Sequence, residues 1–286
     1  MESRTPDAAE FRAGQRKSWN NAATGWDKWA KQMLEWTGHV SERLVELAGV
    51  RAGSRVLDVA AGLGEPALTA AYKAGPEGSV VATDISPEML AYARERVAAA
   101  GVSNIEFIES EASKLEFPEA GFDCAVSRWG IIFEPEAEAT AARIRGFLKP
   151  GARMAISSWG TPPEVPMIAL PMMEVLSHLE QPPPPPGTPG PLSRPTADAI
   201  SAILQGGGFS GIEVEETEVV VHFASAEEFT SHAQDIVAPL VALLEPYPQD
   251  VRDAAWNAVT RAARQHAGDD GTVTMTNKVL LASGTA

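Results

Sequence analysis

The sequence predicts an α/β protein built on a doubly wound, mostly parallel sheet of seven strands, with an N-terminal helical flap and an inserted helical cap. Short apolar runs alternate with helical segments, which is typical of a parallel sheet covered by helices. A glycine-rich turn follows the first apolar run, and an aspartate ends the second. Two further apolar runs lie near the C-terminus and complete the predicted sheet.

Residues 1–50 are expected to form the flap, with helix over 10–48 interrupted at Gly25 and Gly38. Four tryptophans lie seven, three and seven residues apart, so they can share one helical face: Trp19, Trp26, Trp29 and Trp36. That face either packs on the domain or covers the functional site. In the second case Trp26 and Trp29 would contact the substrate.

Residues 51–160 are predicted to form the core of the sheet. The five expected strands lie near 55–60, 79–84, 104–109, 122–128 and 152–158, and the helices between them near 65–74, 86–100 and 135–147. A Lys-Pro-Gly turn at 149–151 precedes the fifth strand.

Residues 161–195 are expected to form a proline-rich lid or loop. A short helix is predicted at 167–179, and the five prolines of 182–186 favour an extended polyproline II segment. Residues 196–286 then complete the sheet, with a helix at 196–206 and strands at 212–223 and 273–282. The helical segment between these strands, about 226–266, is predicted to be a cap that forms part of the substrate pocket.

The run from Val56 to Ala67 predicts a buried strand, a tight turn at Gly62 and Gly64, and the start of a helix. Asp84 ends the next strand, where a doubly wound fold holds a ribose diol. The turn formally matches a dinucleotide fingerprint. Glu65, however, would repel a pyrophosphate at the helix N-terminus, and Asp58 adds a second acid. A cationic, phosphate-free nucleoside such as S-adenosyl-L-methionine fits these charges better.

These segments resemble motifs of the class I S-adenosylmethionine-dependent methyltransferases, which have a Rossmann-like fold. The likeness is to the small-molecule branch that includes the ubiquinone/menaquinone C-methyltransferases, and it covers residues 51–160. It rests on the glycine turn, on Asp84 with the Ile-Ser-Pro-Glu-Met-Leu that follows, on 107–112 and on 122–130. Ala60-Ala61 and Glu111 depart from the family, which often has Gly-Cys and Asp at these places.

The resemblance implies roles for individual positions. Ala60, Gly62 and Gly64 would pass close to the methionine part of the cofactor, and Asp58 would bind its ammonium group. Asp84 would accept hydrogen bonds from both ribose hydroxyls. The other implied contacts are Ile85 and Met89 flanking the adenine, Glu111 and Ala112 at its amino edge, and Ser127, Arg128 and Trp129 near the transferred methyl.

A general base is needed only if the acceptor must lose a proton. His178, His222 and His232 are the candidates, although no catalytic residue need exist. Arg128 follows the fourth strand and could hold an anionic acceptor group or pair with Glu134, and Trp129 could stack on a planar acceptor or pack in the core. No metal-ligand spacing is present, so no metal is predicted.

Composition narrows the class of partner. A formal charge of −15 from 38 acids and 23 bases argues against nucleic acid and anionic membranes. The one cysteine, Cys124, excludes an internal disulfide, and the first residues lack the apolar segment of a signal peptide. A cytoplasmic monomer or homodimer is expected.

The sequence therefore predicts a methyltransferase that moves a methyl group from S-adenosyl-L-methionine to a carbon or oxygen of a small, fairly apolar acceptor. It would act mainly by proximity and orientation. Two alternatives remain open, an NAD(P)-dependent oxidoreductase and a non-catalytic, cofactor-binding scaffold.

Overall fold

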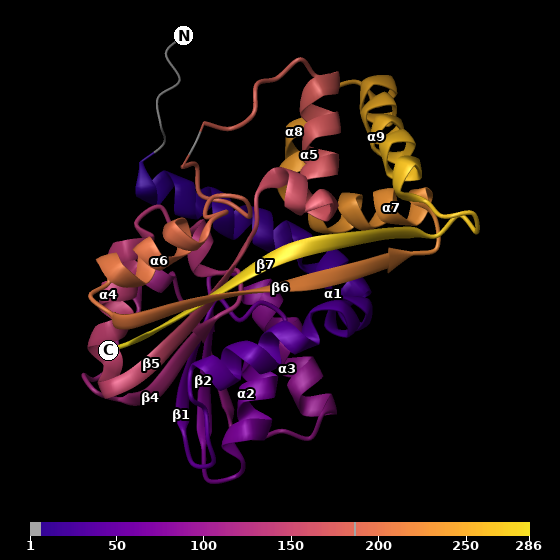
Figure 1. Cartoon of the computed structure of the whole chain (residues 1–286). Helices are drawn as coiled ribbons and strands as arrows, with labels where there is room; N and C mark the ends of the chain where they lie inside the picture. The colour runs from indigo at the N-terminus through magenta and orange to yellow at the C-terminus, as the bar shows by residue number, and fades with distance from the viewer. Residues whose placement is uncertain (1–6, 186) are drawn as a thin grey trace.

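The computed structural model describes residues 7–185 and 187–286, and Figure 1 shows their arrangement. Seven strands form one sheet in the order β3-β2-β1-β4-β5-β7-β6. The first five are parallel, while β7 is antiparallel to both of its neighbours. Their bounds are Arg55–Val59 (β1), Ser79–Asp84 (β2), Ile105–Glu109 (β3), Phe122–Ser127 (β4), Leu148–Trp159 (β5), Ser210–Phe223 (β6) and Val273–Thr285 (β7). The predicted doubly wound sheet is confirmed.

Helices cover both faces of the central strands. Val56 and Leu57 are neighbours on β1, yet both are fully buried and belong to different apolar clusters, one on each face. Helices α1 and α2 contribute to the first cluster, and α4 and α6 to the second. The main helices are Ala8–Leu47 (α1), Ala67–Ala74 (α2), Pro87–Ala99 (α3), Ala137–Phe147 (α4), Pro166–His178 (α5), Ala197–Gly206 (α6), Ala226–Ile236 (α7), Ala238–Leu244 (α8) and Gln249–Ala263 (α9).

Helix α1 is one continuous helix of 40 residues, so the predicted interruptions at Gly25 and Gly38 are wrong. A glycine inside a helix costs only about 1 kcal/mol, which the packing of α1 outweighs. Gly25 is there for a close contact: a Cβ at this position would lie 2.0 Å from the backbone oxygen of Asp235 in α7. The glycine lets the two helices approach each other.

The cap stands beyond the end of β5 and consists of α7, α8 and α9, with α5 packed on α9 (Figure 1). It is carried by a two-stranded extension of the sheet. Strand β5 pairs with β7 only from Val279 onward, so β6 is the only strand of the described sheet that pairs with residues 273–278. The predicted helical insertion between the last two strands is therefore present, and the proline-rich segment contributes α5 to it.

No helix of the described residues has the length and apolar character that crossing a membrane requires. No group of three or more His, Cys, Asp or Glu side chains in that part of the chain could hold a metal ion.

Candidate cofactor and acceptor site

The glycine turn after β1 has a backbone that few side chains allow. Ala60, Gly62 and Gly64 all have positive φ, at 61°, 54° and 96°. The Ala61 N–H donates to the Thr83 carbonyl oxygen at 2.9 Å, which ties the turn to β2. A Cβ on Gly62 would meet no atom within 4 Å, so the turn has open space beside it. This arrangement leaves room for a ligand against the backbone.

Asp84 lies at the carboxyl end of β2 and is fixed by backbone donors. Its two carboxylate oxygens accept from the N–H groups of Gly62 and Ser86, each at 2.8 Å. Burial raises the pKa of Asp84 above its usual value, and the hydrogen bonds from these N–H groups reduce the increase without cancelling it. Each oxygen keeps a second lone pair, so the carboxylate can still accept hydrogen bonds from a diol.

Asp58 is a buried carboxyl group without a partner. It is 0% exposed, and neither of its oxygens has a hydrogen-bond partner in the described chain. Burial raises its pKa well above the usual range; the positive charge of Arg128 opposes this, and the carboxyl groups of Glu65 and Asp84 reinforce it. The nearby Ala67 N–H also lowers the pKa of Asp58, although its geometry is not that of a hydrogen bond. An unpaired buried carboxylate is costly unless a cation joins it.

The residues assigned to adenine lie beside Asp84. The Ser110 N–H donates to the Asp84 carbonyl oxygen at 2.9 Å, which places the turn carrying Glu111 and Ala112 next to β2. Met89 is buried under α1, with Ala22 and Ala23. The structure thus brings Ile85, Met89, Glu111 and Ala112 to the carboxyl edge that carries the glycine turn; their contacts with a cofactor stay a prediction.

Ser127 has its hydroxyl fully engaged in the protein. Its Oγ donates to the Val59 carbonyl oxygen at 2.8 Å and accepts the Ile131 N–H at 3.1 Å. The side chain therefore joins the ends of β1 and β4, and any contact with a ligand has to compete with these two bonds.

Arg128 contacts α1. Its Nη1 donates to the hydroxyls of Thr37 and Ser41, both at 3.0 Å. The proposed pairing of Arg128 with Glu134 is wrong, because Glu134 accepts from Arg12 at 3.0 Å. The first turns of α1 lie over the carboxyl edge and bring Arg12 to that carboxylate.

Trp129 adjoins a second aromatic ring that the sequence did not single out. It stacks on Trp159, with ring centroids 4.3 Å apart and planes 2° apart. One face of Trp129 is therefore covered by protein, so an acceptor cannot stack there. Trp159, like Trp129, directly follows a predicted strand. This shared position is the sequence signal that could have identified Trp159.

Trp26 and Trp29 join α1 to the cap. The Trp26 Nε1–H donates to the Ile236 carbonyl oxygen at 3.2 Å, and the Trp29 Nε1–H donates to Asp235 at 2.8 Å. Trp29 is only 9% exposed. Of the two explanations for the tryptophan face, packing accounts for Trp29, while the partly buried Trp26 packs against the cluster that contains Met89.

The three candidate histidines lie apart from one another. His178 is exposed at the end of α5, and His222 is exposed on β6, where its Nδ1 lies 3.0 Å from the Thr274 hydroxyl. His232 is buried between α1 and α7, in edge contact with Trp29 and Trp36. Burial lowers its pKa to about 4. The structure does not gather these histidines at the glycine turn.

Helix α1 also supplies polar contacts that the sequence did not predict. Asn20 Oδ1 accepts from the Ser86 hydroxyl at 2.6 Å, beside Asp84, and Arg16 pairs with Glu109 at the end of β3. Thr24 and Tyr92 share a hydrogen bond of 3.2 Å between their hydroxyls. The N-terminal half of α1 thus covers the carboxyl edge, as a flap would.

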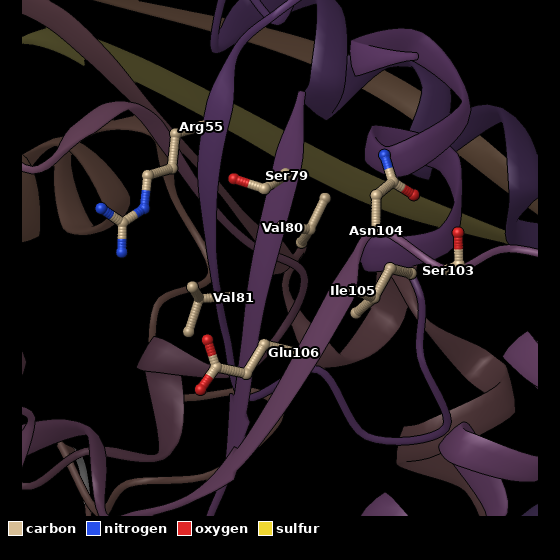
Figure 2. A pocket seen from close by; sticks show the side chains of 8 residues that line it. All are labelled: Arg55, Ser79, Val80, Val81, Ser103, Asn104, Ile105 and Glu106. Atoms are coloured by element: carbon tan, nitrogen blue, oxygen red, sulfur yellow. The ribbon is translucent and has the colours of Figure 1, made fainter. Parts of the chain in front are cut away.

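A separate surface hollow of about 470 Å³ lies at the opposite end of the strands, near the amino ends of β1, β2 and β3 (Figure 2). Residues at or near the amino ends of three strands line it, including Arg55, Ser79 and Asn104. Ligands of open α/β sheets bind at the carboxyl ends of strands. The hollow is therefore distinct from the candidate site.

Comparison with known proteins agrees with this geometry. Residues 56–151 match the family model described as a methyltransferase domain. The ubiquinone/menaquinone biosynthesis C-methyltransferase UbiE of Pseudomonas fluorescens is 40% identical over 119 residues, which are 41% of this chain and 46% of that protein. The chain spans about half the length of the curated relatives it matches.

Two solved structures share the fold. Phosphoethanolamine N-methyltransferase 2 of Haemonchus contortus, crystallised with S-adenosylhomocysteine, has a TM-score of 0.59 at 21% identity, covering 96% of this chain and 60% of its own. The [4+2]-cyclase SpnF has a TM-score of 0.52 at 17% identity, covering 91% and 93%.

The strand order, the glycine turn and the matched segment identify a class I S-adenosylmethionine-dependent methyltransferase domain. Within that class, the UbiE C-methyltransferases are among the proteins that the chain resembles in sequence.

Proposed function

We propose that the whole chain is a methyltransferase that transfers the methyl group of S-adenosyl-L-methionine to a carbon or oxygen of a small, fairly apolar acceptor. The observation that carries the proposal is Asp58, a buried carboxyl group whose two oxygens have no partner among the described residues, beside an open glycine turn. A cationic, phosphate-free cofactor would supply the missing partner. Asp84 would hold its ribose, and Asp58 its ammonium group.

When bound, this cofactor supplies an electrophilic methyl group on a good leaving group, so the protein's main contribution is orientation. The described residues provide it in two ways. Rigid strand ends and the glycine turn fix one reactant, while α1 covers the edge and excludes water, which strengthens electrostatic interactions inside. The acceptor would lie beyond Arg128 and Trp129, between the sheet edge and the cap.

The fold does not decide between catalysis and its alternatives, since a cyclase shares it. Incubation with S-adenosyl-L-methionine carrying a labelled methyl group and a panel of small acceptors tests the proposal. We expect the acceptor to carry the labelled methyl group and S-adenosylhomocysteine to form in the same molar amount. Cofactor binding without transfer to any acceptor would favour the scaffold or a non-methylating enzyme.

An oxidoreductase is the less favoured alternative. Glu65 lies partly buried at the start of α2, where it accepts a hydrogen bond from Thr69 at 2.7 Å and would oppose a pyrophosphate. A thermal shift with NAD or NADP, and none with S-adenosyl-L-methionine, would reverse the assignment. We also propose a cytoplasmic monomer or homodimer that does not act on nucleic acid; cell fractionation and light scattering test these points.

A further inference from the structure

A second polar group without a partner in the described chain follows β4, the strand that pairs with β1 beside Asp58. The indole Nε1–H of Trp129 is buried, and no described residue accepts a hydrogen bond from it. Leaving a buried donor unpaired costs about 1–3 kcal/mol, and a phenylalanine would fill much the same space without that cost. Asp58 on β1 pairs in register with Val126 on β4, three residues before Trp129. Two unsatisfied groups thus lie at the carboxyl ends of adjacent strands.

The Trp129 ring is held rigidly. Its backbone has φ of +54°, a conformation that costs a side chain about 1 kcal/mol or more. The backbone N–H of Trp129 donates to Ser157 Oγ at 2.9 Å, and Gly130 packs so tightly that a Cβ there would lie 2.4 Å from the Ala60 Cβ. The stack on Trp159 fixes the plane of the ring. The indole N–H therefore has a defined position.

Arg128 brings a positive charge beside the Trp129 ring. Its guanidinium carbon lies 5.3 Å from the centroid of the Trp129 ring. Thr37 and Ser41, both buried on α1, orient the group through Nη1. A guanidinium carries five N–H donors, of which Nη1 supplies two, so others remain for a ligand.

From this placement we propose that Arg128 and the Trp129 Nε1–H bind an oxygen anion of the acceptor, so that the enzyme takes acceptors that ionise to a phenolate, enolate or carboxylate. This rests on the proposed function, because it assigns the acceptor side of the same site. An oxyanion would pair the buried indole donor and add a negative charge beside Arg128.

Such a site would replace a general base. None of the three candidate histidines lies with Arg128 and Trp129, so the acceptor's proton would leave to solvent as the anion forms. The acceptor anion then attacks the methyl carbon through its oxygen or a conjugated carbon. A carbon–oxygen or carbon–carbon bond forms, and the methyl–sulfur bond breaks with its electron pair left on sulfur. In carbon attack, the carbon's proton is also lost to solvent.

The test uses the full chain saturated with S-adenosylhomocysteine, whose binding is first verified by calorimetry, and 4-nitrophenol as the probe. The phenolate absorbs visible light and the phenol does not, so absorbance reports ionisation of the bound probe. An opposite charge within about 4–6 Å favours ionisation by one pKa unit or more. We expect wild type to raise the ionisation constant of bound probe at least about tenfold, and Arg128→Gln and Trp129→Phe to reduce that gain.

Trp256→Phe, in α9, is the matched control and should keep the wild-type gain. Nitrobenzene should bind at least about tenfold more weakly than 4-nitrophenol, and 4-nitrobenzoate distinguishes a carboxylate acceptor from a phenolate. The proposal is overturned if the bound phenol ionises like the free one, if nitrobenzene binds equally well, if no probe binds, or if Trp129→Phe matches wild type. Failure to bind S-adenosylhomocysteine would instead contradict the proposed function.

Discussion

At the scale of single residues, the site combines groups that destabilise the protein while no ligand is bound. Within the described part of the chain, Asp58 is a fully buried acid without a hydrogen bond, and Trp129 has a strained backbone and an indole N–H without an acceptor. Burial and strain of this kind concentrate where a ligand binds. Asp84 differs, since two backbone donors satisfy it before any ligand arrives.

Asp58→Asn should abolish cofactor binding and stabilise the ligand-free protein at neutral pH. The folded pKa of Asp58 is raised, so the carboxyl favours folding while it is protonated and loses this contribution as the pH rises through the folded pKa. An amide never ionises. Thermal melts with and without S-adenosyl-L-methionine measure both effects.

Asp123→Asn is the matched control for that prediction. Asp123 accepts from the Arg55 N–H at 2.8 Å and pairs with Lys149, contacts that together hold its pKa below the usual range despite the opposing effect of burial. Its replacement should destabilise the protein and leave cofactor binding intact. If Asp58→Asn behaved like Asp123→Asn, Asp58 would be a structural residue.

At the scale of elements, α1 connects the cofactor edge to the cap. Its first half contacts Ser86 and Glu109 at the sheet, and its middle contacts Asp235 of α7 through Lys28 and Trp29. The sequence indicated a helix there and an aromatic face. It could not show which surface that face meets, because the partner lies some 200 residues away in the chain.

Gly25→Ala should separate α1 from α7, since the new methyl would lie 2.0 Å from the Asp235 carbonyl oxygen. Overpacking of this kind costs about 1–3 kcal/mol. Gly14→Ala is the control on the same helix, where a Cβ meets nothing within 4 Å, and it should stabilise by up to about 1 kcal/mol. Urea unfolding of both variants measures these changes in the free energy of unfolding. Equal changes would mean that the α1–α7 contact is loose.

His232 should make the α1–α7 contact sensitive to acid. Burial lowers its folded pKa to about 4 from the usual 6.5, so this contribution to stability is full above pH 6.5 and is lost as the pH falls toward 4. The shift corresponds to up to about 3 kcal/mol. His232→Phe should flatten the unfolding free energy over this range, whereas His178→Phe, at an exposed position, should keep the wild-type slope. Equal slopes in wild type and His232→Phe would refute the assignment.

At the scale of the whole molecule, the sheet was predictable because local signals specify it. Apolar strands, the glycine turn and strand-end acids lie close together in sequence, and the fold places them as expected. The acceptor side was harder to predict because it is assembled from distant segments. Thr37 meets Arg128, Arg12 reaches Glu134, and Trp159 covers Trp129. The residues around each candidate histidine likewise form no pattern that predicts where that histidine lies in the fold.

The most direct test of the central claim is a calorimetric titration of S-adenosyl-L-methionine into the full chain, in parallel with Asp84→Asn. Asparagine keeps one acceptor oxygen for the turn but loses the charge toward the ribose. Charge-assisted hydrogen bonds contribute about 1.5–3 kcal/mol each, so we predict one-to-one binding by wild type and roughly 10- to 100-fold weaker binding by the variant. No binding by wild type, or equal affinity in both proteins, would contradict a cofactor site at the carboxyl ends of β1 and β2.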